Sequence, residues 1–103
     1  MKGQRFLDRV FTAEEQALAL GKGELSAQFL AGRFAAKEAV AKALGPPFGW
    51  LEVAILSEAG GRPMVGLSGR AALAAEGLEV LVSISHSEHY ASAFAIAQTR
   101  EVG

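Results

Sequence analysis

The segment from Glu24 to Leu44 constrains the fold most, because it is long, rich in Ala and Leu, and free of proline. It is followed at once by Gly45-Pro46-Pro47. Ala and Leu are strong helix formers, whereas a glycine followed by proline ends a helix. The pattern therefore predicts a long helix that ends at Leu44. Small residues along it would let another element approach closely: Gly32, Ala35, Ala36 and Ala39.

Shorter elements flank this helix. Thr12 and Glu15 have the spacing of a capping box, which predicts a helix running to about Leu20. Alternating apolar residues predict strands over 51–56, 64–67, 80–85 and 91–98, with a turn over 59–63. Ser68 is placed to cap a short helix through Glu76. Helices followed by strands indicate an α+β fold with a mostly antiparallel sheet packed on the long helix.

Composition excludes several classes of protein. A chain of 103 residues has room for one domain. Ten basic and eleven acidic residues give a net charge of −1, which does not favour a nucleic-acid binder. The lack of cysteine excludes a disulfide scaffold, a thiolate zinc site and a cysteine nucleophile. Neither a membrane-length apolar run nor a signal-peptide core is seen, so we expect a cytoplasmic protein without a membrane partner.

Phe34, Glu38 and Lys42 fall on one stripe of the long helix, because residues four apart are neighbours on a helix. One interpretation is a solvent-facing Glu38–Lys42 pair, worth about 0.2–0.5 kcal/mol. The other is a carboxylate for a hard cation beside a lysine for a phosphate. The pattern alone leaves both open.

A second polar cluster, Ser85-His86-Ser87, stands at the end of a predicted strand. Its hydroxyls and imidazole could hold a phosphate, or could simply be the polar residues of a turn. A serine hydrolase is not favoured, because the chain lacks a Gly-x-Ser-x-Gly motif. Gly61-Arg62-Pro63 needs no explanation beyond a hairpin turn.

Together these stretches resemble one family. Residues 29–45, FLAGRFAAKEAVAKALG, are similar to the signature helix of the holo-acyl-carrier-protein synthases, the small trimeric 4′-phosphopantetheinyl transferases. Residues 61–63 resemble the family's Gly-Lys/Arg-Pro turn, and residues 82–87, VSISHS, resemble its closing strand. Residues 5–12, RFLDRVFT, resemble the stretch that enters its first full helix. The blocks occur in the family's order over nearly the whole chain.

The resemblance implies an enzyme of fatty acid biosynthesis that moves phosphopantetheine from coenzyme A to a serine of apo acyl carrier protein. Glu38 would be a Mg²⁺ ligand, and Lys42 would contact the coenzyme A phosphates and assist catalysis. The remaining coenzyme A contacts would come from Gly45, Gly61, Pro63, Ser85, His86 and Ser87. The carrier protein would face Arg5, Arg9, Arg33 and Phe34.

The resemblance also implies a homotrimer, with sites at the subunit boundaries. The family opens with a strand whose aspartate is a second acidic metal ligand, and no such block precedes Arg5. We therefore expect residues 1–103 to be a single, N-terminally shortened transferase domain, either because the start was placed too far downstream or because the form itself is shortened. The alternative is a non-catalytic module that binds coenzyme A or the carrier protein.

Overall fold

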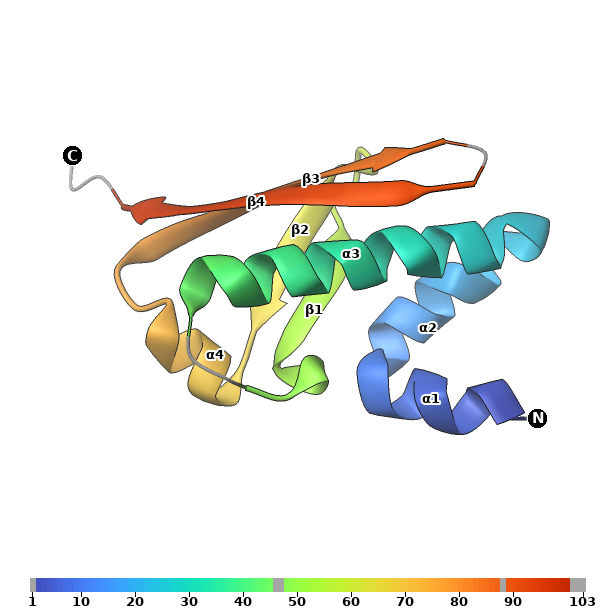
Figure 1. Cartoon of the computed structure of the whole chain (residues 1–103), viewed down its shortest axis with the longest axis horizontal. Coiled ribbons are helices and arrows are strands. Elements are labelled where there is room, and N and C mark those ends of the chain that lie inside the picture. The colour runs from blue at the N-terminus through green and yellow to red at the C-terminus, as the bar shows by residue number, and fades with distance from the viewer. Residues whose placement is uncertain (1, 46–47, 88, 101–103) are drawn as a thin grey trace.

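The computed structural model describes residues 2–45, 48–87 and 89–100. Helices α1 (Lys2–Val10) and α2 (Ala13–Leu20) precede the long helix α3 (Ser26–Leu44), and the strands follow (Figure 1). The later elements are β1 (Val53–Ser57), β2 (Pro63–Leu67), α4 (Gly69–Ala74), β3 (Leu78–His86) and β4 (Ala91–Thr99). Short 3₁₀ turns cover Gly23–Leu25 and Trp50–Glu52. The predicted α+β class is confirmed.

Helix α3 ends at Leu44, as predicted. Gly45 follows with φ of +96°, a conformation that glycine adopts without a steric penalty, and its N–H donates to Ala41 O. The helix begins later than Glu24, because Gly23 has φ of +55° and opens the 3₁₀ turn. The two prolines that support the stop signal lie outside the described residues.

The capping box of α2 is confirmed. Thr12 Oγ1 accepts from the Glu15 N–H at 3.2 Å, and Glu15 Oε1 accepts from the Thr12 N–H at 2.8 Å. Helix α1 was not predicted as a helix from its own residues. The four-residue spacing of Phe6 and Val10 was the sequence signal that could have predicted this helix, and Val10 is buried.

The strands form two antiparallel pairs, in which Val53 of β1 faces Leu67 of β2 and Leu78 of β3 faces Thr99 of β4. Two details of the prediction are wrong. The first strand starts at Val53 because the preceding residues form a 3₁₀ turn. The helix predicted through Glu76 ends at Ala74.

One carboxylate explains how the segment before β1 is held. Glu52 Oε2 accepts from the Gly49 N–H at 2.9 Å, and its Oε1 accepts from the Ala71 N–H at 3.1 Å. Glu52 thereby satisfies an amide in the first turn of α4. The Ser68 side chain, predicted to cap that helix, makes no such bond.

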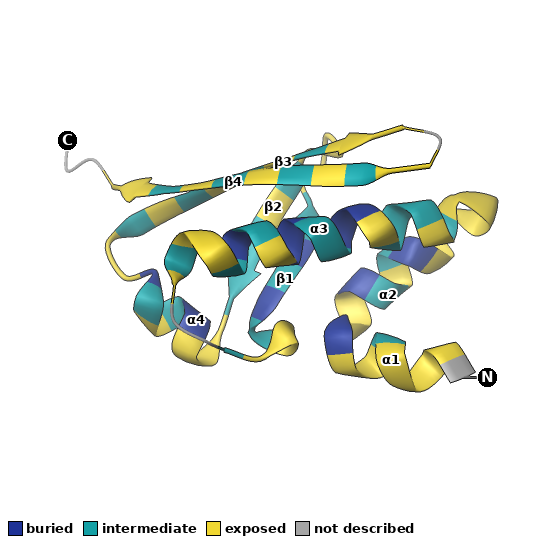
Figure 2. Cartoon of the chain, in the orientation of Figure 1, coloured by how far each residue is buried: buried dark blue, intermediate teal, exposed yellow. Residues whose placement is uncertain are grey.

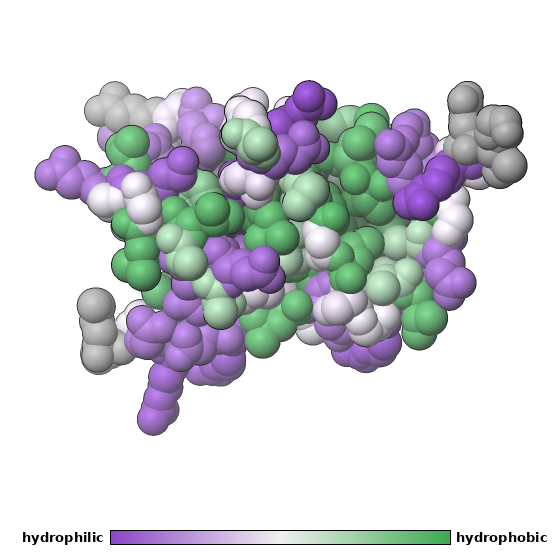
Figure 3. All heavy atoms as spheres, turned by 180° about the vertical axis from the view of Figure 1, so that it is seen from behind, coloured by the Kyte–Doolittle hydropathy of each residue, from purple (hydrophilic) through white to green (hydrophobic). Residues whose placement is uncertain are grey.

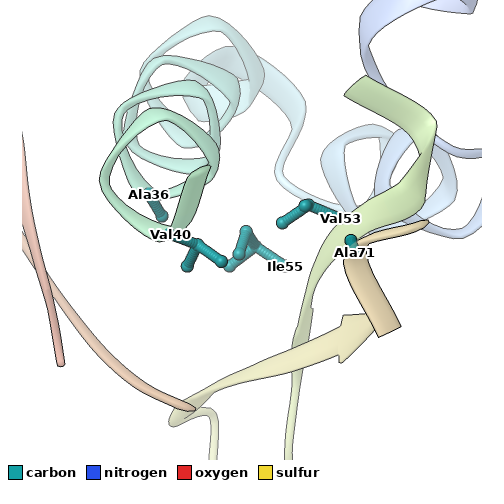
Figure 4. Packing of buried hydrophobic residues seen from close by; sticks show 5 residues of the cluster. All are labelled: Ala36, Val40, Val53, Ile55 and Ala71. Carbon is teal, nitrogen blue, oxygen red and sulfur yellow. The ribbon is translucent and has the colours of Figure 1, made fainter. Parts of the chain in front are cut away.

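The core lies between α3 and the strands (Figure 2). Its buried members meet in one cluster (Figure 4): Ala36, Val40, Val53, Ile55 and Ala71. The β3–β4 hairpin runs along α3 and packs alternate side chains against this cluster (Figure 1). Gly32 and Ala36 are both buried, so the expected close approach to the small residues of α3 is confirmed at these positions.

Apolar surface remains outside this core. On the hairpin, Leu81, Phe94 and Ile96 are exposed, and Leu81 faces Ile96 across the strands. Seen from behind, apolar residues gather across the middle of the molecule (Figure 3). In the described part of the chain, no helix combines the length and hydropathy needed to cross a bilayer.

Candidate active site

Glu38 and Lys42 lie on the exposed side of α3. Neither of the two ion pairs found among the described residues joins them, so the pair considered from the sequence does not form here. Both side chains reach solvent, one turn apart on the same side of the helix. A carboxylate and an ammonium group therefore lie on the same side of the helix without forming an ion pair with each other.

Lys42 stands on a cleft of about 290 Å³. On the α3 side the cleft is lined by Lys37, Ala41, Lys42 and Gly45, and on the other side by Phe48, Gly49, Trp50 and Val53. Most of these side chains are apolar. If Lys42 bound the anionic group of a ligand, the cleft could therefore hold an uncharged chain attached to that group.

A buried ion pair supports this cleft. Lys37 Nζ lies 2.8 Å from Glu15 Oε1, and both side chains are fully buried. The same ammonium donates to Trp50 O at 2.9 Å and to Val53 O. Glu15 Oε2 accepts from the Ile55 N–H at 2.7 Å. The pair therefore joins α2, α3 and β1 behind the cleft.

Sequence reasoning missed this pair. Glu15 was interpreted only as a capping residue, and no role was assigned to Lys37. Burial lowers the pKa of Lys37, while the Glu15 carboxylate beside it acts in the opposite direction. With a carboxylate and two carbonyls as acceptors, all three ammonium protons have partners.

The Ser85-His86-Ser87 cluster lies at the other end of α3. His86 packs over Gly32, and Gln28 Nε2 donates to Ser87 O at 3.3 Å. His86 also borders a cavity of about 220 Å³ together with Lys22, Leu25, Gln28 and Phe29. Lys22 was not among the predicted site residues, although its Gly21-Lys22-Gly23 setting placed it at a helix end.

A single chain does not bring the two clusters together. At a rise of 1.5 Å per residue, Gly32 and Lys42 are about 15 Å apart along the axis of α3. Glu38 and Lys42 are exposed on that helix, whereas the Gly32 side is covered by the β3 end. One ligand could touch both clusters of this chain only if it were extended.

Gly61 and Pro63 lie at a third place, the turn between β1 and β2. Gly61 has φ of +89°, and its N–H donates to Glu58 O at 2.8 Å. Pro63 begins β2 opposite Ser57 and borders a cavity of about 440 Å³ between β2 and β3. Arg62 and Arg100 also border that cavity.

The predicted carrier-facing residues separate into two groups. Arg5 and Arg9 are exposed on α1. Phe34 stacks between Phe6 and Trp50, with ring centroids 6.4 Å and 5.1 Å away. Phe6 and Trp50 are 52% and 40% exposed and were missed from the sequence. We call Arg5, Phe6, Arg9, Phe34 and Trp50 the α1 surface.

Arg33 is not part of that exposed surface. Only 6% of it is accessible, and its guanidinium donates to Ser57 Oγ at 2.7 Å and to Leu56 O at 3.4 Å. It also lies over the Phe29 ring at 4.2 Å. Burial lowers the pKa of Arg33. In this chain its contacts tie α3 to the end of β1.

The described residues offer few ligands for the implied Mg²⁺. Among residues 2–45, 48–87 and 89–100, no three His, Cys, Asp or Glu side chains gather in one place. Magnesium usually binds one or two carboxylates and completes its shell with water and phosphate oxygens. The exposed Glu38 carboxylate, one turn from Lys42, fits the role of one such protein ligand.

Comparison with known proteins identifies the family of this chain. The family model of the 4′-phosphopantetheinyl transferase superfamily matches residues 1–97. The holo-acyl-carrier-protein synthase of Protochlamydia amoebophila is 51% identical over 98 residues, covering 91% of this chain and 80% of the relative.

Solved structures share the fold. That of holo-ACP synthase from Plasmodium yoelii has a TM-score of 0.81 at 30% identity, covering 97% of this chain and 82% of that chain. A holo-acyl-carrier-protein synthase from Bacillus anthracis, in complex with CoA (3′,5′-ADP), has a TM-score of 0.78 at 33% identity, covering 93% and 82%. The chain therefore belongs to the 4′-phosphopantetheinyl transferase superfamily and, within it, to the holo-acyl-carrier-protein synthases.

Proposed function

We propose that this protein transfers 4′-phosphopantetheine from coenzyme A to a serine of an apo acyl carrier protein, and that it serves fatty acid biosynthesis. The observation that carries the proposal is that Glu38 and Lys42 are exposed one turn apart on α3, with Lys42 at the rim of an apolar cleft, in a chain of this family. A phosphate at Lys42 and a pantetheine arm in the cleft suit the charge and the apolar lining. We treat residues 1–103 as a single transferase domain around one core.

In the proposed reaction, the carrier serine oxygen attacks the β-phosphorus of coenzyme A. The new bond joins that oxygen to phosphorus, the bond from phosphorus to the bridging oxygen breaks, 3′,5′-ADP leaves with that oxygen, and the serine proton passes to solvent water. The Lys42 ammonium binds phosphate oxygens and stabilises the charge that develops on them. Glu38 would hold Mg²⁺, which, when bound, neutralises phosphate charge and orients the reacting groups.

The separation of the two clusters supports an assembled site. Lys42 is in the last turn of α3, whereas His86 of β3 packs over Gly32 in the first half of that helix, so we propose that one coenzyme A contacts Lys42 of one subunit and His86 of another. The exposed Leu81, Phe94 and Ile96 offer apolar surface that association would cover. A homotrimer satisfies both features, with Gly61 and Pro63 near the nucleotide end.

The α1 surface is the proposed docking site for the carrier protein. Arg5 and Arg9 supply positive charge beside the exposed rings of Phe6 and Trp50. Positive charge steers an acidic partner, and aromatic anchors contribute most of the binding energy in many interfaces. The acidic, helical surface expected of a carrier protein matches this combination.

The test is incubation of the protein with coenzyme A, Mg²⁺ and apo acyl carrier protein, followed by intact mass measurement of the carrier. We expect a gain of one phosphopantetheine, lost in Glu38→Ala and in Lys42→Ala. Glu14→Ala, which removes an exposed glutamate of α2, is the matched control and should retain the transfer. Binding of coenzyme A without any transfer would instead indicate a non-catalytic binding module.

A further inference from the structure

Helix α3 and strand β3, which carry the two polar clusters, approach each other closely at Gly32. A Cβ added there would lie 2.5 Å from His86 Nε2, 2.9 Å from His86 Cε1 and 3.0 Å from Ile84 Cγ2. Non-bonded carbon atoms prefer separations of about 3.5–4.0 Å. The imidazole therefore occupies the space that a side chain at Gly32 would take.

The strand end is held at a second point one helical turn away. Gln28 Nε2 donates to Ser87 O at 3.3 Å, and Gln28 and Gly32 lie on the same side of α3. Ile84 and His86 are two residues apart on β3, so their side chains lie on the same face of the strand. Both point toward the helix. The backbone is tethered by Gln28, and the imidazole is placed by contact with Gly32.

Helix stability does not explain a glycine at this position. Glycine in a helix interior is less favourable than alanine, and α3 has Ala at several other positions, including the adjacent Ala31. The extra space is used by His86, whose ring borders the cavity that also contains Lys22. A methyl group at Gly32 would have to push the imidazole away from this position.

We propose that Gly32 is a positioning residue for His86: the missing side chain lets the imidazole lie on α3, and this sets how it faces the cavity beside Lys22. The consequence for transfer rests on the proposed function, in which His86 contacts coenzyme A. Gly32 itself touches no substrate. Its effect passes entirely through the imidazole.

The test is a double-mutant cycle of Gly32→Ala and His86→Ala. The dissociation constant of coenzyme A is measured by calorimetry, unfolding is measured by thermal denaturation, and the His86 imidazole signals are recorded by NMR. We expect Gly32→Ala to fold with an unchanged or higher Tm, to shift the His86 signals, and to weaken coenzyme A binding about tenfold, as for a lost hydrogen bond to a charged group. In the His86→Ala background, Gly32→Ala should change binding less than twofold.

Ala31→Gly is the matched control, because it alters helix propensity at an exposed neighbouring position. It should leave both the His86 signals and coenzyme A binding unchanged. The proposal is overturned if Gly32→Ala leaves the His86 signals in place, or if it weakens binding equally with and without His86. If His86 moves but even the wild type neither binds coenzyme A nor transfers phosphopantetheine, the placement of the imidazole stands and the proposed function fails.

Discussion

Removing the ammonium of Lys37 should destabilise this protein more than any surface substitution. In Lys37→Met the side chain keeps its length, but Glu15 is left as a buried, unpaired carboxylate, and Trp50 O and Val53 O lose their donor. Breaking a buried ion pair in this way costs about 3–5 kcal/mol. Small domains are stable by about 5–15 kcal/mol in total, so this one change removes a large part.

The free energy of unfolding is obtained from urea denaturation followed by circular dichroism. The loss corresponds to a fall in Tm on the order of 10–40 °C for a domain of this size. Lys42→Met, the same substitution on the exposed side of the same helix, should change stability by less than about 0.5 kcal/mol. A loss of under 1 kcal/mol in Lys37→Met would refute the reasoning.

A compensating variant distinguishes the effect of the unpaired charge on stability from the effect of altered packing. In Glu15→Gln/Lys37→Met the buried charges are gone, and the amide oxygen can still accept from the Ile55 N–H, although the Thr12 N–H loses the acceptor that Glu15 Oε1 provides. Replacing both members of a buried pair is often close to neutral. We expect the double variant to be clearly more stable than Lys37→Met. Equal loss in both would show that packing, and not the unpaired charge, is responsible.

Three further predictions follow from other parts of the structure. Hydrogen bonds from Gly49, Ala71 and Arg70 hold the pKa of Glu52 below its usual value, so its contribution to stability is present above the unfolded pKa and lost as the pH falls through the folded one. Glu52→Gln should therefore flatten the acid side of the urea midpoint measured from pH 6 to 3. Gly45→Ala should cost about 1–3 kcal/mol because φ is +96°, whereas Gly3→Ala within α1 should not destabilise, as urea curves will show. Phe6→Ala should raise the KM for the carrier protein about tenfold without changing the KM for coenzyme A, and an unchanged carrier KM would contradict docking at the α1 surface.

Local pattern determined most of the architecture. The capping box at Thr12, the Ala-rich run ending at Gly45 and the alternation in the later strands depend on short-range backbone preferences, and each formed close to its predicted place. The signature residues of α3 likewise identified the family from the chain alone. Glu38 and Lys42 lie one turn apart on the same side of α3, as their helical spacing required.

Contacts between distant residues decided the rest, because no local preference encodes them. The Glu52 carboxylate reaches Ala71 and so delays the start of β1, and Lys37 finds Glu15 on another helix. Tertiary packing buried Arg33 and left Phe6 and Trp50 exposed, although residue type alone would favour the reverse. The glycine at position 32 is explained only by the tertiary structure, in which β3 brings His86 against α3. Helix propensity alone would favour alanine there.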